Sequence, residues 1–499
     1  MKKRIIFLIL IALFSASVIM SIMSCAENNS EAKKDASGDE AGTAEININN
    51  NTDENAGIST DETSGDIFAD DLPDQDFGGA AFRIAAQDAA WLYVLYDSQE
   101  ETGEVINDAV YRRNRKIEER FNVVITQYLV DVASLPKKNA QAGIDAYELY
   151  LPVDRDALNF GSEGFIYKLA EIPNINIDKP YWSQSLNKCL TIAHDLYFAY
   201  GSFNLSVYDY THVLLFGKQM ITDLGLENPY ELVKNGKWTY DKYDEMAKAA
   251  VKDTDGNGIM DENDIFGLVS MDKQVLPCFW IGAGVQSISK SSDDIPQFTL
   301  RQDQKFASVI DRIFSMTYDN NSWYPKYTDD TKAEYFMNNH TLFFDCTFKK
   351  VGDLRSAESD FGIIPYPKYT LEQEKYYTRV EGGNPGVVLK TSSNLQMIGT
   401  ILEALNAESA KTVIPAYYDI ALKAKYTRDE ESSQMLDIIF EGRIYDLGDT
   451  YWCNILRDGM FLNMFKKNDR NLASQLEKVE PKINGEIDKV VNAFTSLGQ

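Results

Sequence analysis

Residues that commonly carry catalysis are scarce or isolated in this sequence. Histidine occurs three times, as His194, His212 and His340, and no HExxH motif or other metal-ligand spacing surrounds it. A Gly-x-Ser-x-Gly nucleophile motif is absent, and so is a P-loop, since Gly-Ala-Gly at 282–284 is not followed by Lys. Carboxylates are abundant, but nothing in the sequence places two of them opposite each other as a glycosidase requires. We therefore expect that this protein is not an enzyme.

Basic residues are also outnumbered. The chain has 49 Lys and Arg against 76 Asp and Glu, a formal net charge of -27. Nucleic-acid binding requires clustered Lys and Arg, so the charge balance excludes that class of partner. The overall negative field also disfavours acidic ligands, although a local basic pocket is compatible with it. Acidity mainly favours solubility.

Cysteine is rare as well, with five in the chain and no CxxC pair. Leaving Cys25 aside, the cysteines are far apart in the sequence. They could form two disulfides outside the membrane or remain as buried thiols, and their wide spacing favours thiols. These residues are Cys189, Cys278, Cys346 and Cys453.

Only one long apolar run is present, over residues 5–22, and it follows the basic residues 2–4. This layout is typical of a secretory signal. The run ends in Ile-Met-Ser-Cys at 22–25, which resembles a lipobox, where the chain is cut before a cysteine that carries lipid. We therefore expect a signal peptide at 1–24 and a lipoprotein anchored through Cys25 to the extracellular face of the cell membrane. An uncleaved signal anchor is the alternative, because the run is nearly long enough to span a bilayer.

Residues 25–76 contain almost nothing apolar to bury and are rich in Asn, Glu, Asp, Ser, Thr and Gly. Such a composition favours disorder, and we expect an acidic tether that leads to a folded part beginning near Phe77. The remaining length exceeds what one hydrophobic core usually supports. Two domains or lobes are therefore expected.

Hydrophobic periodicity predicts an α/β fold. A strand at 82–85, an amphipathic helix over 106–121 and a strand at 123–128 are the start of a largely parallel sheet. Thr239 is a good N-cap for a second helix. Helix dominates after residue 395, with a break expected at Pro415. Further strands are predicted at 213–216, 341–344, 361–364 and 386–389.

Four segments together resemble one protein family. Residues 216–226 (FGKQM…DLGL) are similar to its strand followed by a helix, and 236–243 (GKWTYDKY) to its G-x-W-T-W-D-x-F motif. Residues 253–267 (DTDGNG…DIFG) resemble D-x-D-G-D-G…D-x-Y-G, and 361–368 (FGIIPYPK) resemble x-G-x-x-P-x-P. The family is that of family 1 extracellular solute-binding proteins, the carbohydrate-type class that includes relatives of maltose-binding protein. The resemblance runs from about residue 77 to the end.

The resemblance implies an α/β, two-lobed periplasmic-binding-protein-like fold (type II), with discontinuous lobes, a hinge and a ligand cleft. The lobes would be 77–204 plus 365–412 and 205–364 plus 413–499. It also implies that closure around a small solute, an oligosaccharide by preference, creates the shape recognised by the permease of an ABC importer. A binding protein that reports to a membrane sensor and a secreted glycoside-cleaving enzyme are the alternatives.

The binding residues of the family form no fixed motif, so candidates follow from chemistry. A site that binds a sugar needs flat aromatic rings against the sugar faces and carboxylates, amides or Arg to hydrogen-bond the sugar hydroxyls. In α/β sheets such groups gather in loops at the carboxyl ends of strands. Core packing is the competing interpretation for each aromatic residue, and an ordinary loop role for each polar one. The candidates are Asp88, Trp91, Tyr93, Tyr208, Asp209, Tyr210, Trp280, Asp345, Thr347, Glu381, Asn384 and Trp452.

One loop has the ligand spacing of an EF-hand. Oxygen ligands stand at positions 1, 3, 5, 7, 9 and 12, and Gly258 stands at position 6, where a sharp turn is required. We expect a structural Ca²⁺ that ties this loop to the helix starting at Thr239. An empty acidic turn is the alternative, because the Asp at position 12 is shorter than the usual Glu. The ligands would be Asp253, Asp255, Asn257, the carbonyl of Ile259, Asp261 and Asp264.

Overall fold

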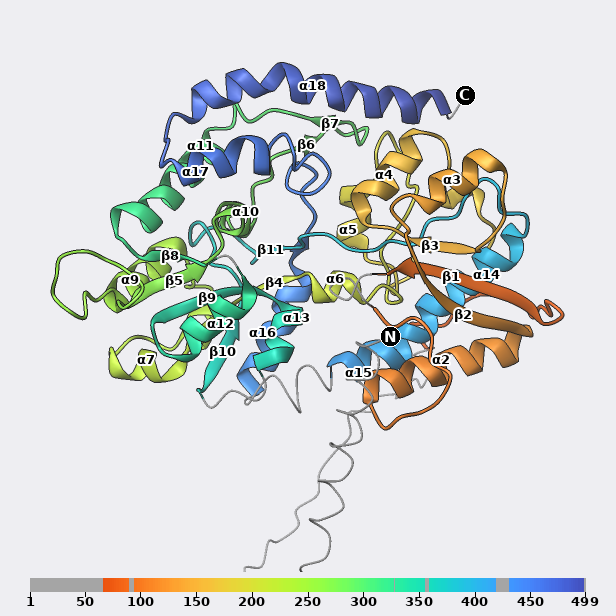
Figure 1. Ribbon diagram of the computed structural model, residues 1–499, viewed down its shortest axis with the longest axis horizontal. Helices are drawn as coiled ribbons and strands as arrows, with labels where there is room; N and C mark the ends of the chain where they lie inside the picture. Colours follow the sequence, from red (N-terminus) through yellow and green to blue (C-terminus); the bar gives the residue numbers. More distant parts are fainter. Residues whose placement is uncertain (1–65, 89–93, 327, 355–358, 419–429, 498–499) are drawn as a thin grey trace, which may run out of the picture. The chain divides into compact units, whose positions relative to one another are not determined.

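A computed structural model describes residues 66–88, 94–326, 328–354, 359–418 and 430–497 (Figure 1). The predicted signal peptide, Cys25 and the candidates Trp91 and Tyr93 lie outside these ranges.

Residues 66–76, which the composition assigns to the tether, are bound to the folded part. Asp70 pairs with Arg120 at 2.8 Å, and Asp66 pairs with Lys411 at 2.7 Å. Phe68 and Leu72 of this segment also pack against the core, so the ordered chain begins before Phe77.

The first sheet is parallel, with the strand order β2-β1-β3. Its strands are β1 (Ala80–Gln87), β2 (Val123–Val130) and β3 (Leu149–Leu151). The helix α2 (Val105–Phe121) joins β1 to β2 and buries Val110, Ile117 and Phe121 along one stripe. The predicted strand, helix and strand are thus confirmed.

The second sheet is mixed, with the strand order β10-β4-β9-β5-β8. Its strands are β4 (His212–Gly217), β5 (Phe266–Ser270), β8 (Trp323–Pro325), β9 (Thr341–Thr347) and β10 (Phe361–Ile364). β4 runs antiparallel to both neighbours, whereas β8, β5 and β9 are mutually parallel. Every residue of β4 and β5 is buried, which explains why they appear as continuous apolar runs.

Helices cover this second sheet. α9 (Tyr240–Ala250) and α12 (Asp329–Met337) contact β5 and β9, while α7 (Lys218–Asp223), α8 (Pro229–Lys234) and α16 (Glu430–Glu441) contact β10. The side chain of Thr239 caps α9 by accepting a hydrogen bond from the backbone N–H of Lys242, as predicted. Tyr240, Tyr243 and Ala247 form its buried face.

The remaining elements connect and flank the two sheets. Before β5 they are α3 (Leu135–Ala142), α4 (Asp154–Ser162), η3 (Leu169–Glu171), α5 (Gln184–Leu190) and α6 (Ser206–Asp209). After β5 they are α10 (Asp272–Gly282), β6 (Ser289–Lys290), β7 (Pro296–Gln297), α11 (Gln304–Phe314), η4 (Ser315–Asp319), α13 (Phe348–Asp353), β11 (Thr378–Arg379), α14 (Leu395–Glu408), η6 (Ser409–Val413), α15 (Ile414–Tyr418), β12 (Arg443–Ile444), η8 (Arg457–Phe461), α17 (Leu462–Lys466) and α18 (Leu472–Leu497).

Two local predictions differ from the structure. Residues 386–389 form no ladder. Val387 bridges to Tyr150 and Leu389 to Ile166, so the segment makes single bridges to two different parts of the chain. Pro415 does not break the helical region. The helices α14, η6 and α15 follow one another without a gap, and the π-helical turn η6 shortly before Pro415 is where the regular hydrogen-bond pattern changes.

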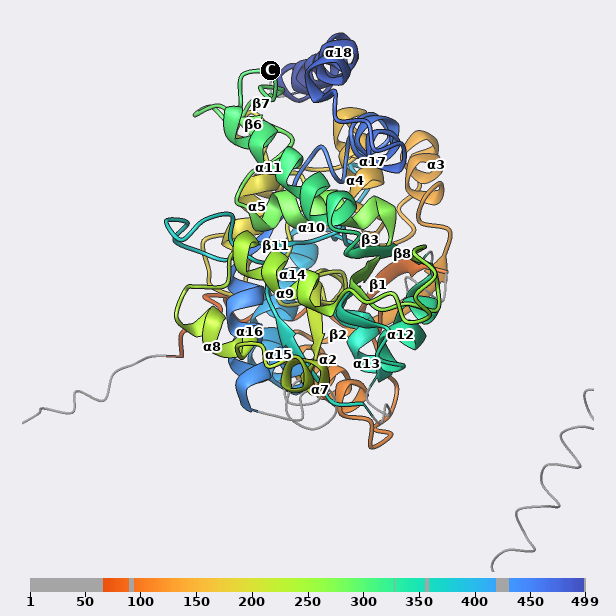
Figure 2. The same ribbon diagram turned by 90° about the vertical axis from the view of Figure 1, so that its left-hand side faces the viewer.

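The long helix α18 connects distant parts of the chain. It lies beside β7 in both views (Figures 1 and 2), and near its end Phe494 stacks on Tyr197 with ring centroids 4.5 Å apart. Gly161 of α4 leaves room for this ring, since a Cβ there would lie 3.2 Å from Phe494. Among the described helices, none combines the length and apolarity needed to span a bilayer.

Candidate functional site

A pocket of about 500 Å³ lies where strands of both sheets end. Val153 and Asp154 follow β3, Met271 and the start of α10 follow β5, and Thr347 is the last residue of β9. The carboxyl ends of parallel strands are where α/β sheets bind ligands. The lining residues are Val153, Asp154, Tyr210, Met271, Lys273, Gln274, Asp330, Thr347, Lys349, Lys350, Asp353, Glu381, Gly382 and Gly383.

Glu381 and Tyr210 reach the pocket together because their backbones are paired. The N–H of Glu381 donates to the carbonyl of Tyr210 at 3.1 Å, and Thr211 forms a bridge with Val380. Glu381 Oε2 lies 3.1 Å from His212 Nε2, and its Oε1 lies 3.7 Å from Arg379 Nη2. Burial would raise the pKa of Glu381, but Arg379 and His212 hold this pKa well below its ordinary value. The pocket therefore presents an ionised carboxylate.

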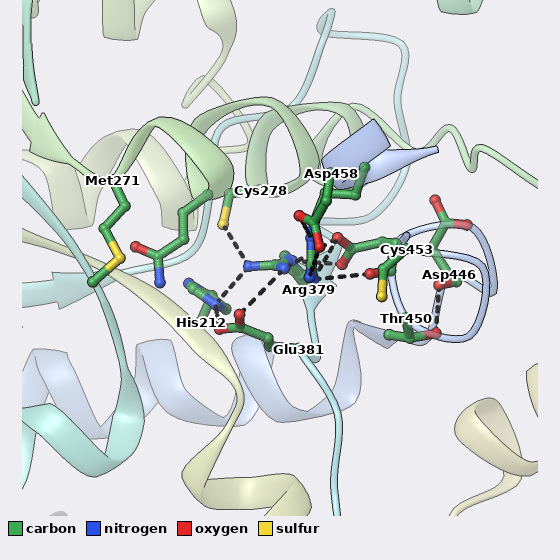
Figure 3. Close-up of polar contacts among 12 residues, drawn as sticks. His212, Met271, Cys278, Arg379, Glu381, Asp446, Thr450, Cys453 and Asp458 are labelled. Atoms are coloured by element: carbon green, nitrogen blue, oxygen red, sulfur yellow. Dashed lines mark hydrogen bonds and ion pairs between the residues drawn. The ribbon is translucent and has the colours of Figure 1, made fainter. Parts of the chain in front are cut away.

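Arg379 is the centre of a buried charge network (Figure 3). Its side chain is fully buried, with Nε 2.6 Å and Nη2 3.1 Å from the two carboxylate oxygens of Asp449. Arg457 adds a contact of 3.5 Å to Asp449. The pairing of β11 with β12 brings Arg379 to this C-terminal segment. Bidentate contacts of this kind are what a buried guanidinium needs to offset its lost hydration.

His212 connects this network to the core of the second sheet. Its Nδ1 lies 3.0 Å from Asp345 Oδ1, and Asp345 also accepts hydrogen bonds of 2.5 Å from Ser270 and Tyr366. Burial would raise the pKa of Asp345, but His212 and Lys332 hold this pKa well below its ordinary value. The cluster therefore fixes β4 to β9 with charged groups.

His212, Cys278 and Asp345 also bring potential metal ligands within 4.8 Å of one another. Arg379, however, lies 2.8 Å from His212 Nε2 and 4.0 Å from Cys278 Sγ. A permanent cation at these distances repels a metal ion. The group is therefore suited to ion pairing and not to metal binding.

Asp154 forms the opposite part of the pocket wall. Its Oδ2 accepts a hydrogen bond of 2.5 Å from the hydroxyl of Tyr445, and its N–H donates to the carbonyl of Gly383 at 3.1 Å. Burial raises the pKa of Asp154 to about 6, against the hydrogen bond from Tyr445, which lowers it. A Cβ at Gly382 would lie 3.1 Å from Asp154 Oδ2, so glycine allows the two segments to approach.

The wall that follows β5 and β9 is rich in hydrogen-bond donors. Gln274 is 4% exposed, and its Oε1 accepts a hydrogen bond of 2.8 Å from Lys332 Nζ. Lys350 pairs with Asp330 at 2.6 Å and with Asp353 at 3.2 Å. Lys273 and Lys349 add two more ammonium groups.

Three of the twelve predicted ligand residues line this pocket: Tyr210, Thr347 and Glu381. Asp88 is exposed at the end of β1 and does not line it.

The structure places the other described candidates in packed surroundings. The ring of Tyr208 lies 4.4 Å from the guanidinium of Arg443, and Asp209 accepts a hydrogen bond of 2.8 Å from Tyr417. The indole of Trp280 is fully buried and donates to Asp446 at 3.0 Å. Asp345, Asn384 and Trp452 are also buried. Asp345 lies in the core of the sheet, the N–H of Asn384 donates to Ser206, and Trp452 packs on Tyr451.

Several lining residues were not predicted from the sequence, among them Asp154, Lys273, Gln274, Lys349 and Lys350. Each follows a strand by two to four residues, so the strand-end rule identifies them once the strands are known, but β3 and β5 were not predicted from the sequence. Lysine was not among the residue types expected to bind a sugar, which left out Lys273, Lys349 and Lys350.

The predicted calcium loop lies away from the pocket. Carboxylate oxygens of Asp253, Asp255 and Asp264 come within 4.8 Å of one another, and Gly256 and Gly258 adopt φ angles of +71° and +80°. The backbone N–H of Gly258 lowers the pKa of Asp253, and that of Asp261 lowers the pKa of Asp264. The loop is closed by a bridge between Lys252 and Ile265 immediately before β5.

The four cysteines within the described residues are free thiols. Cys278, Cys346 and Cys453 are buried and Cys189 is partly buried, which confirms the preference for thiols over disulfides.

No protein-family model and no curated protein matches this sequence. Solved structures do match. M. tuberculosis UspC aligns with a TM-score of 0.56 at 11% identity, over 83% of this chain and 100% of that one. A sugar transporter from Rhizobium etli in an open conformation gives 0.54 at 12%, over 83% and 99%. An ABC substrate-binding protein from Listeria monocytogenes in complex with cycloalternan gives 0.52 at 13%, over 82% and 99%. The two-lobed α/β fold of the periplasmic-binding-protein type is thus confirmed.

Proposed function

We propose that this chain is an exported solute-binding protein that captures a saccharide in the pocket lined by Tyr210, Thr347 and Glu381 and delivers it to an ABC importer. The observation that carries the proposal is the position of the pocket, at the carboxyl ends of strands from both sheets. The fold supports it, since the matched structures include an ABC substrate-binding protein holding cycloalternan and a sugar transporter.

The lining chemistry suits a polyhydroxylated ligand. Glu381 and Asp154 accept hydrogen bonds, while Gln274, Thr347 and the lysines donate them, and a sugar hydroxyl does both. Tyr210 supplies an aromatic ring for a sugar face. A volume of about 500 Å³ is ordinary for a small-molecule site and favours an oligosaccharide of modest length.

The proposal includes the two lobes and the anchor. We infer that the lobes, 77–204 plus 365–412 and 205–364 plus 413–499, close around the solute because Asp154 and Gln274 contact it from opposite walls. A lipid on Cys25 would hold the protein on the extracellular face of the cell membrane, near the permease subunits.

A thermal-shift screen of the full-length chain against mono- and oligosaccharides tests the proposal. A ligand at a hundredfold excess over its Kd stabilises the folded form by about 2.7 kcal/mol, which raises the melting temperature measurably. If no saccharide raises it, the proposal is wrong. Analysis of the same mixtures for cleaved sugars tests the alternative of a glycoside-cleaving enzyme. A signalling assay with a membrane sensor tests the alternative of a binding protein that reports to such a sensor.

We also propose that the loop of residues 253–264 binds a structural Ca²⁺. The donor set fits a hard cation, since Asp253, Asp255 and Asp264 gather their carboxylates and the carbonyl of Ile259 stands at the seventh position. When bound, the ion would neutralise these charges and fix the loop beside β5. Melting in calcium and in chelator tests this assignment.

A further inference from the structure

The two walls of the pocket differ in charge and in hydrogen-bonding character. Lys273, Lys349, Lys350, Gln274 and Thr347 stand on the wall that follows β5 and β9, together with two acids, Asp330 and Asp353, that pair with Lys350. Asp154 and Glu381 stand on the opposite wall, which has no lysine among the described lining residues. A pocket for a neutral sugar has no need to separate donors from acceptors. The separation indicates a ligand that is itself polarised.

Gln274 shows the direction of the donor wall. Lys332 Nζ can only donate, so the atom of Gln274 that it contacts at 2.8 Å must be the amide oxygen. The amide nitrogen then faces the pocket that Gln274 lines, where none of the described residues accepts a hydrogen bond from it. The amide nitrogen is open to the pocket, so a ligand that enters the pocket can accept a hydrogen bond from it.

Lys273 stands next to this amide in the first turn of α10. Across the described part of the chain, Lys273 takes part in no ion pair, and the only acid of that turn, Asp272, contacts Lys466 at 3.2 Å. The N-terminal end of a helix is already electropositive, so a lysine there raises the positive potential further. An anionic group between Lys273 and Gln274 offsets this charge and satisfies the amide.

Lys349 and Lys350 stand on the same wall as Lys273. Lys350 pairs with Asp330 at 2.6 Å and with Asp353 at 3.2 Å, so these acids offset its charge, and Lys273 and Lys349 supply the positive charge of the wall. Tyr210 is the sole aromatic residue among the described lining residues. The site therefore relies on charge and hydrogen bonding more than on ring stacking.

We propose that the pocket binds an anionic saccharide of the uronic acid class, with its carboxylate at Lys273 and Gln274 and its hydroxyls at Glu381 and Asp154. This rests on the proposed function and names its substrate class. The net charge of -27 repels such a ligand at long range, so the affinity must come from these local contacts.

The test compares charged and neutralised forms of the same saccharide on the full-length chain. The probes are trisaccharides of galacturonate, glucuronate and mannuronate, each beside its methyl ester, with maltotriose as a neutral sugar. By isothermal titration calorimetry, we expect at least one uronate to bind roughly tenfold or more tightly than its ester. Equal affinity for every acid and its ester, or binding of maltotriose alone, overturns the inference and leaves the proposed function standing. Failure of every saccharide to bind rejects both.

Two variants locate the carboxylate. Lys273→Met removes the charge, and Gln274→Glu keeps an oxygen for Lys332 while replacing the amide donor by an anionic oxygen. Each is expected to reduce uronate affinity by about tenfold or more and to reduce the affinity for the ester by a smaller factor. Lys375→Met is the control, because this exposed lysine pairs with Glu441 at 3.5 Å outside the pocket. Uronate affinity of wild-type strength in folded Lys273→Met protein contradicts the inference.

Discussion

Arg379 Nη1 lies 2.8 Å from Nε2 of His212, and neither side chain has any exposed surface. The same guanidinium binds Asp449, and the same imidazole reaches Glu381 and Asp345. This pair therefore links the pocket carboxylate to the second sheet and to the C-terminal segment. Substitution of Arg379 or His212 should therefore affect the stability of the fold as well as the pocket.

Arg379→Met is expected to lower the free energy of unfolding by about 3–5 kcal/mol, because it leaves Asp449 buried without its main partner. Urea denaturation followed by circular dichroism measures the loss. Arg112→Met is the matched control, since Arg112 also pairs with a carboxylate at 2.6 Å, that of Glu101, but on the surface. The control should lose less than about 1 kcal/mol. Equal losses in the two variants would show that burial of the Arg379 network does not matter.

Glu381→Gln is expected to weaken saccharide binding by roughly tenfold or more, because hydrogen bonds to charged acceptors contribute about 1.5–3 kcal/mol. The melting temperature without ligand should also fall, because glutamine has a single carbonyl oxygen and turns its NH2 group toward either His212 or Arg379. Binding is therefore measured well below the melting temperature of the variant. Calorimetric titration gives the affinity. Glu163→Gln, at an exposed acid that pairs with Lys137, serves as the control. Unchanged binding in Glu381→Gln would remove Glu381 from the site.

Local pattern predicted much of the fold, and pairing between distant segments did not follow from it. The stripe of α2 and the cap of α9 are set by neighbouring residues, so the sequence alone identifies them. The order β10-β4-β9-β5-β8 depends on contacts between segments far apart in the sequence, more than a hundred residues for the pairing of β4 with β9 and with β10. The apolar run at 386–389 resembles a strand, yet its pairing depends on Tyr150 and Ile166, which lie elsewhere in the chain and each give it only a single bridge.

The sequence predicted three residues of the pocket but not which of the other candidates are covered by distant segments. Thr347 and Asp345 point to the same face of β9, since they are two residues apart, but only Thr347 reaches the pocket. Asp345 is covered by Ser270 and Tyr366, which come from β5 and from the segment after β10. Trp280 was expected to meet ligand, but helix α10 turns it toward Asp446. Such covering depends on tertiary packing and leaves no trace in local sequence.

The calcium proposal predicts a difference between two acidic residues of one loop. Wild-type protein in calcium at about a hundredfold excess over its Kd should gain about 2.7 kcal/mol over protein in chelator. Asp255→Ala should abolish this gain, because Asp255 is at the third ligand position. Glu262→Ala is the control, since Glu262 is exposed and not at a ligand position. An Asp255→Ala protein that melts in excess calcium at the wild-type temperature would contradict the proposal.

Asp154 predicts a dependence of stability on pH. Burial raises the pKa of Asp154 in the folded protein to about 6, above its ordinary value of 3.8. Because the pKa is raised in the folded state, protonation of Asp154 contributes most to the free energy of unfolding below pH 3.8. This contribution is lost as the pH rises to about 6. Asp154→Asn cannot ionise, so its stability relative to wild type should increase across this window by up to about 1.4 kcal/mol per pH unit and stay constant above pH 7. Urea midpoints of the two proteins between pH 4 and 8 measure this difference, in which all other titrating groups cancel. A pH-independent difference would mean that Asp154 has an ordinary pKa in the fold.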